Sequence, residues 1–446
     1  MRLYIHLLLA LCLLISPAAA AEKIYDAVIK GGRVIDPETG LDVVRNVGLF
    51  GRKIAKISTD DLTGKTVLDA TDLVVSPGFI DLHAHRQNLV TQTYQIHDRV
   101  TTALDLEAGL FPLQDHLKSR RGKSLIHYGY SSGHAYVRSL VKQGDLTRAY
   151  HEVPTDSELK AILKGVEEGL DEGGIGIGLL MDYFSLGVNE AELEGLFKLA
   201  AKRGVTIFSH IRMPDDMLDP SGYKEMMDQA RKEGVDVTTE LYPYTAGSTE
   251  INSGIFDHDW QKKFGITYDD LEWPPTGERF TDKAMWDQHR KDYPKGVVIL
   301  HAMTEEWVKQ AMTYPGVIIA SDGMAMERSD QRAHPRGMGT YARVVGKYVR
   351  DDIVLILPDA INRMTYLLAR RLEKFTPIMK NKGRLQEGRD ADITIFDPET
   401  VIDQATFANP NQFSKGITHV IVAGKIVVKR EEIQKDTFPG EPITTK

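Results

Sequence analysis

The strongest chemical signal in the sequence is a pair of histidines, His83 and His85, which follows the mostly apolar run from Gly78 to Leu82. Side chains two residues apart in a strand point to the same side of a sheet, so both imidazoles are expected on one face where this strand ends. Two imidazoles on one face suit a divalent metal such as zinc, whose remaining ligands must come from other strands. The alternative interpretation is two unrelated surface histidines.

Acidic residues and histidines also close other predicted strands. Glu107, His210 and Asp322 each stand at the end of a short segment of strand-forming residues. Taken alone, each of the three could be a helix cap or an ion-pair partner. Their joint placement at the ends of the predicted strands two, five and eight, with the histidine pair on strand one, favours a site for one or two divalent metal ions.

The middle of the chain alternates strand-like and helix-like segments, which is the pattern of a parallel sheet with crossover helices. Thr155 and Glu158 predict a capping box at the start of one helix, and Asn189 and Gly204 bound a second one. A (β/α)8 barrel commonly takes about 250 residues and builds its active site at the carboxyl ends of its strands. We therefore expect such a barrel over residues 77–381. Its eight predicted strands end near His83, Glu107, Tyr130, Leu180, His210, Tyr242, His301 and Asp322.

Two β-rich segments flank this middle part, at residues 22–76 and 382–446. Short strand-like runs and turns in both indicate that the two ends of the chain pair into one small composite β-sandwich. Residues from about 249 to 296 interrupt the barrel pattern and carry three of the four tryptophans. This insertion either lies over the barrel mouth or serves as a purely structural flap.

Composition and the N-terminal segment narrow the class of protein. The 446 residues are 42% hydrophobic and 26% charged, as in ordinary globular proteins. A net charge of −8 without a Lys/Arg cluster argues against a nucleic-acid partner. Residues 1–20 predict a cleaved signal peptide and thus a secreted or periplasmic protein, because their apolar run is shorter than the roughly 20 residues of a stable membrane anchor. The single cysteine, Cys12, lies inside that segment, which excludes disulfides from the mature chain.

The motifs of the chain resemble those of the amidohydrolase superfamily and, within it, the N-acyl-D-amino-acid deacylase (D-aminoacylase) family. The resemblance covers nearly all of the mature chain. Its most family-specific part is the run Tyr-Pro-Tyr-Thr-Ala-Gly-Ser from Tyr242 to Ser248, whereas the histidine pair marks only the superfamily. The other matching segments are residues 77–85, 133–138, 209–212, 321–323, 334–336, 383–392 and 405–407.

By this resemblance His83, His85 and Asp322 hold or face one metal, and His210 belongs to a second metal position. The family usually bridges its metal positions with a cysteine at the end of strand two, where this chain has Glu107. A carboxylate oxygen can replace a thiolate on zinc, so Glu107 is the natural bridging group.

Two further differences from related proteins concern the remaining ligands. Residues 174–182 contain no lysine that could become the carboxylated lysine of related enzymes. The strand that normally follows the one bearing His210, and that carries another histidine, is missing from this chain. His301 is the candidate to replace that ligand, unless it is a hydrogen-bonded histidine at the barrel mouth. Glu240 is a weaker substitute.

The ligand set implies a mechanism of amide hydrolysis. A bound metal lowers the pKa of its water to about 7 and polarises the scissile carbonyl group. Asp322 is placed to take a proton from that water and pass it to the departing amine, unless it is only a ligand or a cap. His134 could orient the carbonyl group or stabilise its developing charge. A histidine of the core is the equal alternative for His134.

Substrate recognition rests on four further residues. Arg212 lies two residues beyond His210, and its planar guanidinium suits a substrate carboxylate. The other three match family positions that contact substrate, although each could also be a structural loop residue: Tyr183, Ser248 and Arg336.

The expected function is therefore metal-dependent hydrolysis of N-acyl-amino acids, with the D configuration favoured, in a zinc enzyme that takes one or two ions. A dipeptidase or another cyclic or linear amidase is the alternative within the superfamily, because the fold does not choose the substrate. A non-catalytic binding protein on the same fold is the alternative from another class. The histidines and acids at the expected strand ends speak against it.

Overall fold

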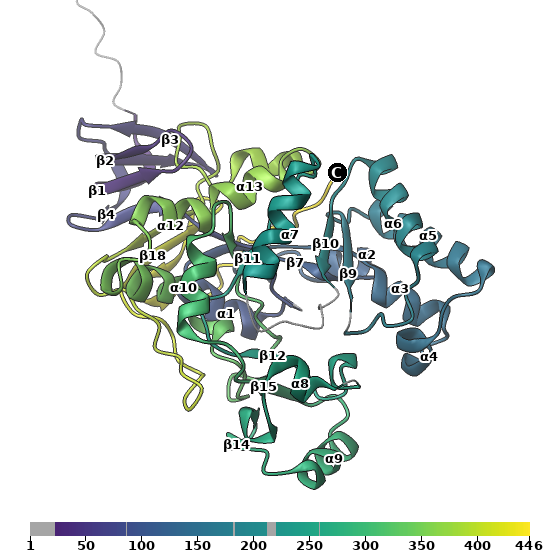
Figure 1. The fold of residues 1–446 in the computed structure, drawn as a ribbon. Helices are drawn as coiled ribbons and strands as arrows, with labels where there is room; N and C mark the ends of the chain where they lie inside the picture. Colours follow the sequence, from purple (N-terminus) through teal and green to yellow (C-terminus); the bar gives the residue numbers. More distant parts are fainter. Residues whose placement is uncertain (1–22, 86, 182, 212–219, 258) are drawn as a thin grey trace, which may run out of the picture.

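The computed structural model describes residues 23–446 except 86, 182, 212–219 and 258. The predicted signal peptide and Arg212 therefore lie outside the described residues. The middle of the chain forms a curled parallel sheet with helices on its outer side (Figure 1). The order of its strands is β10-β9-β8-β7-β6 followed, across a parallel bridge between Ala84 and Gly323, by β16-β11. These strands are β6 (Phe79–Asp81), β7 (Val100–Leu110), β8 (His127–Gly133), β9 (Ile177–Leu180), β10 (Ile207–His210), β11 (Glu240–Leu241) and β16 (Ile318–Ile319).

The helices of this part begin and end largely at the predicted signals. Thr155 and Glu158 make the predicted capping box of α5, Asn189 caps α6 through the backbone N–H of Glu192, and Gly204 ends α6 in the left-handed conformation. The helices are α1 (Leu89–His97), α2 (Gln114–Ser119), α3 (His134–Val141), α4 (Leu146–His151), α5 (Asp156–Asp171), α6 (Glu190–Arg203), α7 (Pro220–Lys232), α10 (Glu305–Thr313), α11 (Arg336–Arg343), α12 (Leu357–Met364) and α13 (Tyr366–Leu372). A π-helix, η3 (Val344–Asp351), continues α11, and the 3-10 helix η4 (Pro377–Asn381) follows α13. No described helix is both long and apolar enough to cross a membrane.

The described parallel sheet has seven of the eight predicted strands. The strand that ends before His301, β15 (Val297–Leu300), pairs antiparallel with two strands of the insertion and is not part of the parallel sheet. The prediction of that segment as a barrel strand was therefore wrong. Its apolar residues satisfied the strand pattern, but their partners come from the insertion.

The described strands leave the parallel sheet open between β10 and β11. Among the described residues between these two strands, α7 is the one helix and no strand occurs, as expected from the missing family strand. The residues of β6 to β9 are buried almost throughout, whereas those of β10 and β11 are half-buried or exposed. Within the described residues, each of the two strands thus has a neighbour in the sheet on one side only.

The two ends of the chain meet in a second sheet, so their predicted pairing is observed, whereas the sandwich arrangement stays a prediction. In the described residues it is one continuous nine-stranded sheet, in which β5 from the N-terminal part pairs with β17 from the C-terminal part. Its inner residues, among them Ile29, Val47 and Ile393, form a separate apolar core. The strands are β1 (Tyr25–Asp36), β2 (Leu41–Phe50), β3 (Lys53–Ser58), β4 (Gly64–Asp69), β5 (Val74–Pro77), β17 (Ile393–Phe396), β18 (Ile417–Val422), β19 (Lys425–Lys429) and β20 (Glu432–Ile433).

The insertion forms a lobe below the parallel strands in Figure 1. Trp260, Trp273 and Trp286 are buried together in its own apolar core. Its elements are β12 (Gly247–Glu250), η1 (Gly254–Phe256), α8 (Trp260–Phe264), η2 (Tyr268–Asp270), β13 (Leu271–Trp273), β14 (Glu278–Arg279), α9 (Lys283–Asp292) and β15. The lobe connects directly to β11, so it stands beside the carboxyl ends of the parallel strands.

Candidate metal centre

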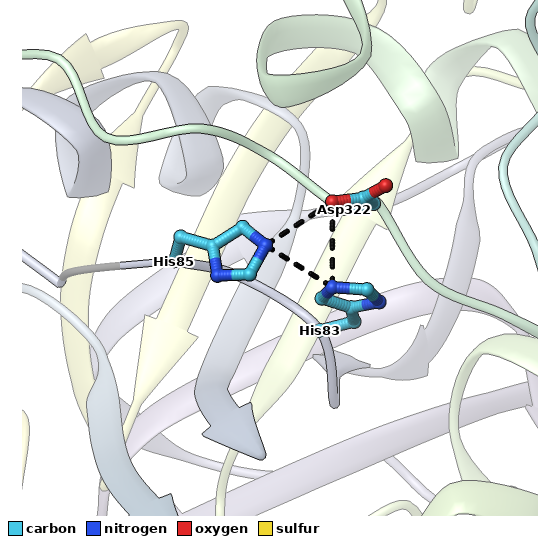
Figure 2. Close-up of side chains that lie close together, drawn as sticks. All are labelled: His83, His85 and Asp322. Atoms are coloured by element: carbon cyan, nitrogen blue, oxygen red, sulfur yellow. Dashed lines mark hydrogen bonds and ion pairs between the residues drawn. The ribbon is translucent and has the colours of Figure 1, made fainter. Parts of the chain in front are cut away.

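Three side chains converge where β6 and β16 end. His83 and His85 follow β6, Asp322 follows β16, and the three point toward one another (Figure 2). The Nε2 atoms of the two histidines are 3.1 Å apart, and Oδ1 of Asp322 lies 3.3 Å from Nε2 of His83 and 3.2 Å from Nε2 of His85. The three donor atoms thus surround one position, as a divalent metal requires.

A buried aspartate holds the two strand ends together. One oxygen of Asp81 accepts the backbone N–H groups of His83 and Ser321, each at 3.1 Å, and its other oxygen accepts the hydroxyl of Ser321. Asp322 itself has a positive φ of 48°, a conformation that is uncommon outside glycine and that clusters at functional sites. The backbone therefore fixes the carboxylate of Asp322 opposite the histidine pair.

Glu107 occupies the position predicted for a bridging carboxylate. Its Oε2 lies 2.9 Å from Nε2 of His83, and its Oε1 lies 3.2 Å from Nδ1 of His210. The two oxygens of one carboxylate thus face the first histidine pair and His210, respectively. This arrangement brings five candidate metal ligands together: His83, His85, Glu107, His210 and Asp322. This group of side chains is called the metal cluster.

Two carboxylates orient the histidine pair from behind. Glu240 at the start of β11 contacts Nδ1 of His83, and Oδ1 of Asp105 lies 3.7 Å from Nδ1 of His85. Carboxylates in this position fix the tautomer and ring orientation of metal-binding histidines. From the sequence, Glu240 ranked only as a weak ligand substitute, and Asp105 was not singled out. The position of Asp105 two residues before Glu107, on the same face of β7, was the available signal.

Neighbouring positive charges keep the carboxylates of the cluster in their ionised form. Burial would raise the pKa of the Glu107 carboxyl, but the facing His83 and His210 rings hold that pKa well below its usual value. Burial also opposes ionisation of Asp322, yet Arg336 and His83 lower its pKa. Burial lowers the pKa of His85, but the neighbouring Asp105 and Asp322 outweigh it and raise the pKa to about 9. The carboxylates are therefore ionised and able to attract a cation.

The donor set fits a divalent metal of the zinc type. The available atoms are imidazole nitrogens and carboxylate oxygens, which zinc binds in catalytic sites. Nε2 of His210 is buried and has no hydrogen-bond partner within the described part of the chain. A buried ring nitrogen without a partner is costly, and a metal ligand role would remove that cost.

A cavity of about 610 Å³ opens onto this cluster. Its walls include four of the cluster residues, His83, Glu107, His210 and Asp322, and two of the predicted substrate contacts, Tyr183 and Ser248. The ring of Tyr183 lies 4.0 Å from that of His210, measured between centroids. Arg336 is buried beside the cavity, with one guanidinium nitrogen 2.9 Å from Oδ2 of Asp322.

Two predicted site residues lie elsewhere. His134 is fully buried, and its Nε2 lies 2.7 Å from Oε1 of Glu192, whose other oxygen contacts Arg138. Nε2 of His301 lies 2.9 Å from Oε2 of Glu272 in the insertion. Neither histidine lines the cavity, so the structure brings neither of them to the metal cluster. His134 therefore matches its alternative interpretation as a histidine of the core. His301 matches its own alternative, a hydrogen-bonded histidine.

Comparisons with known proteins bear on this site. The sequence profile of the amidohydrolase family matches residues 74–427, which include every residue of the cluster. The chain belongs to the amidohydrolase family. The family resemblance stated from the motifs is thereby confirmed, and the protein is a hydrolase.

Characterised amidohydrolases of similar length are known. The chain is 28% identical to the N-acyl-D-glutamate deacylase of Alcaligenes xylosoxydans xylosoxydans, over 90% of this chain and 93% of that one. It is 29% identical to the D-aminoacylase of the same organism, over 94% of this chain and 96% of that one. The fold is similar to that of the N-acyl-D-glutamate deacylase of Bordetella bronchiseptica complexed with zinc and a phosphonate inhibitor, with a TM-score of 0.79 and 25% identity over 95% of this chain and all of that one.

Proposed function

We propose that this amidohydrolase hydrolyses the amide bond of N-acyl-amino acids, with the D configuration favoured. The observation that carries the proposal is the convergence of His83, His85 and Asp322 in a cavity that also presents Glu107 and His210. The similar proteins named N-acyl-D-glutamate deacylase and D-aminoacylase support the substrate class.

The chemistry follows from the residues present. One or two zinc ions held by the cluster would supply Lewis-acid activation of water and of the scissile carbonyl group. Asp322 accepts a proton from the attacking water as the new C–O bond forms and the carbonyl π bond opens, and it then gives this proton to the amine nitrogen as the C–N bond breaks. Arg336 keeps this carboxylate ionised and in place through its contact with Oδ2.

Glu107 is proposed to bridge two metal positions. The support is its placement between His83 and His210, with one carboxylate oxygen toward each. A bridging carboxylate would take the role that a cysteine has in the resembled family. Substrate contacts are proposed for Tyr183, Ser248 and Arg336. A carboxylate contact for Arg212 stays a prediction from the sequence.

The test is an activity panel on zinc-loaded protein with N-acetyl-D- and N-acetyl-L-amino acids, including glutamate, aspartate and leucine, together with dipeptides and hydantoins. Hydrolysis of the N-acetyl-D-amino acids with at least tenfold higher kcat/KM than of the others is expected. A preference for dipeptides or cyclic amides would favour the alternative amidases. Failure of zinc-loaded protein to hydrolyse any amide would favour the binding-protein alternative. The double variant His83→Ala/His85→Ala lacks two side chains of the first metal position, so its rate of hydrolysis gives the background activity.

We also propose that the protein works outside the cytoplasm. The support is the composition of residues 1–20, with one basic residue, an apolar run and small residues before the predicted cleavage position. N-terminal sequencing of the exported protein should give a chain that begins at residue 21 or 22. A chain that retains residues 1–20 in the soluble cytoplasmic fraction would contradict this proposal.

A further inference from the structure

The cavity extends beyond the metal cluster into the opening of the parallel sheet. On this side its walls include residues 206–211 of β10 and its flanks and residues 237–242 of β11 and its flanks. The outer edges of these two strands have no partner among the described strands. Behind the opening, Met227 of α7 and Val308 and Ala311 of α10 also line it. Figure 1 shows α7 and α10 beside β10 and β11. The part of the cavity lined by these residues, called the passage, is therefore continuous with the metal cluster.

The lining of this passage is mostly apolar. Between the metal cluster and the outer helices it consists of aliphatic and aromatic side chains and a few threonine and serine residues. Apolar residues of this lining include Leu82, Leu106, Phe208, Leu241, Ile318 and Met227. Its charged side chains outside the metal cluster are those of Glu240, which contacts His83, and of Arg371, which is paired with Asp236 at 2.6 Å. Among these described residues, none offers an unpaired charge to a charged group of a ligand.

We propose that this passage binds the acyl chain of the substrate and that the enzyme prefers N-acyl-amino acids with long aliphatic acyl groups. The inference rests on the proposed function, because the substrate has to place its amide at the metal cluster. The amino-acid half carries a carboxylate, for which the described lining of the passage offers no free cation. The acyl half can be uncharged along its whole length, and a volume of about 610 Å³ lies in the range of pockets that enclose medium-sized ligands.

Burial of the acyl chain predicts a dependence on its length. Each methylene group that moves from water into an apolar site can raise kcat/KM by about fourfold at most, because the gain applies to the bound transition state. Hydrolysis of the amide then releases a fatty carboxylate and the free amino acid. The expected preference is for the octanoyl or decanoyl compound over the acetyl compound, by at least a hundredfold in kcat/KM.

The first experiment measures kcat/KM for N-acyl-D-amino acids with acyl groups of two to twelve carbons at a fixed amino acid. A second series varies the amino-acid side chain at a fixed acetyl group. A steep rise in the first series supports the passage as the acyl site. A flat first series with a rise in the second series overturns the inference and leaves the proposed function intact.

Variants on α10 test whether the dependence on acyl-chain length arises in the passage. Ala311→Trp fills the passage, so the ratio of kcat/KM for the decanoyl over the acetyl compound should fall more than tenfold. Gln310→Trp places the same bulk on the exposed side of the same helix and should keep the ratio of the parent protein. Ala311→Met is the milder variant, should Ala311→Trp fail to fold. An unchanged ratio in a folded Ala311 variant contradicts the assignment.

Binding gives a readout that does not depend on turnover. Calorimetry should show that the zinc-loaded protein binds decanoate at least tenfold more tightly than acetate, and that Ala311→Trp removes this difference. Absence of hydrolysis of any N-acyl-amino acid would refute the proposed function, and the decanoate measurement would still decide whether the passage takes an acyl chain. Equal binding of the two carboxylates overturns the inference.

Discussion

The guanidinium of Arg336 lies 2.9 Å from Oδ2 of Asp322, while Oδ1 of the same carboxylate faces the Nε2 atoms of His83 and His85. The two oxygens of Asp322 are thus divided between a permanent positive charge and the metal cluster. Arg336 is itself buried and lies over the ring of Tyr242, at 4.5 Å from the centroid. Its position is therefore fixed, and it holds Asp322 ionised and in place, as the proposed proton transfer requires.

Asp322→Asn should lower kcat by about 10²-fold to 10⁴-fold, because an amide cannot accept and release the proton. The change leaves the buried guanidinium of Arg336 without its counter-charge, so the melting temperature should fall, and kcat is compared at a temperature where both proteins are folded. Steady-state kinetics on an N-acetyl-D-amino acid check the effect. Asp330→Asn, on an exposed loop of the same connection, is the matched control and should keep full activity. Near-normal turnover of Asp322→Asn would rule out the proton-transfer role.

Glu107→Gln should lower the zinc content of the protein. The neutral amide loses the negative charge that faces two histidines, and one of its two oxygens becomes an NH₂ group that cannot bind a cation. Elemental analysis after dialysis against a weak chelator should show at least one zinc equivalent fewer than in the parent. Glu306→Gln, at an exposed position of α10, controls for the loss of one carboxylate. Equal zinc content in both variants would leave Glu107 as a structural ion-pair partner.

Glu240→Gln tests the orientation of His83. The carboxylate contacts Nδ1 of His83, and loss of such a partner typically weakens metal affinity or activity by about 10-fold to 100-fold. Zinc titration with a competing chelator should show the weaker affinity, and excess zinc should restore much of the lost activity. Activity that stays low at saturating zinc would assign Glu240 to the reaction itself and not to positioning.

Much of the candidate site followed from the sequence because its candidate ligand residues stand at strand ends. His83, His85, Glu107, His210 and Asp322 could be grouped from the order of the residues alone, since the carboxyl ends of parallel strands meet at one edge. Helix boundaries were predictable for a related reason, because caps are local signals. The joining of the two chain ends in one sheet also followed from their strand patterns.

The features that the sequence did not predict depend on contacts between segments far apart in the chain. The strand before His301 has an ordinary apolar pattern, and only its pairing with β12 and β13 separates it from the parallel sheet. His134 looked like a candidate for catalysis, but its partner Glu192 lies 58 residues away and could not be recognised from the local pattern. The missing family strand after His210 indicated the opening between β10 and β11, whereas the helices that line this opening could be assigned only from the structure.

The junction between the parallel sheet and the nine-stranded sheet should be acid-sensitive. Asp392 is buried and contacts Lys382 at 2.6 Å, Nε2 of His127 at 3.1 Å and the backbone N–H of Ala423 at 2.7 Å. Burial would raise the pKa of Asp392, but Lys382 and His127 together hold it far below its usual value. Because the folded-state pKa is depressed, this stabilisation is complete above the unfolded-state pKa of about 3.9 and is lost as the pH falls below it.

Asp392→Asn should therefore destabilise the protein at pH 7 and make its stability less dependent on acid pH than that of the parent. Removal of one partner of a buried ion pair typically costs about 3–5 kcal/mol, since Lys382 would stay buried with its main counter-charge lost. Urea unfolding between pH 7 and pH 3 measures both effects. Asp390→Asn is the matched control, because Asp390 lies 3.2 Å from the same lysine but is partly exposed and should cost less. If both variants lost stability equally and with the same pH profile, the buried carboxylate would have no special part in joining the two sheets.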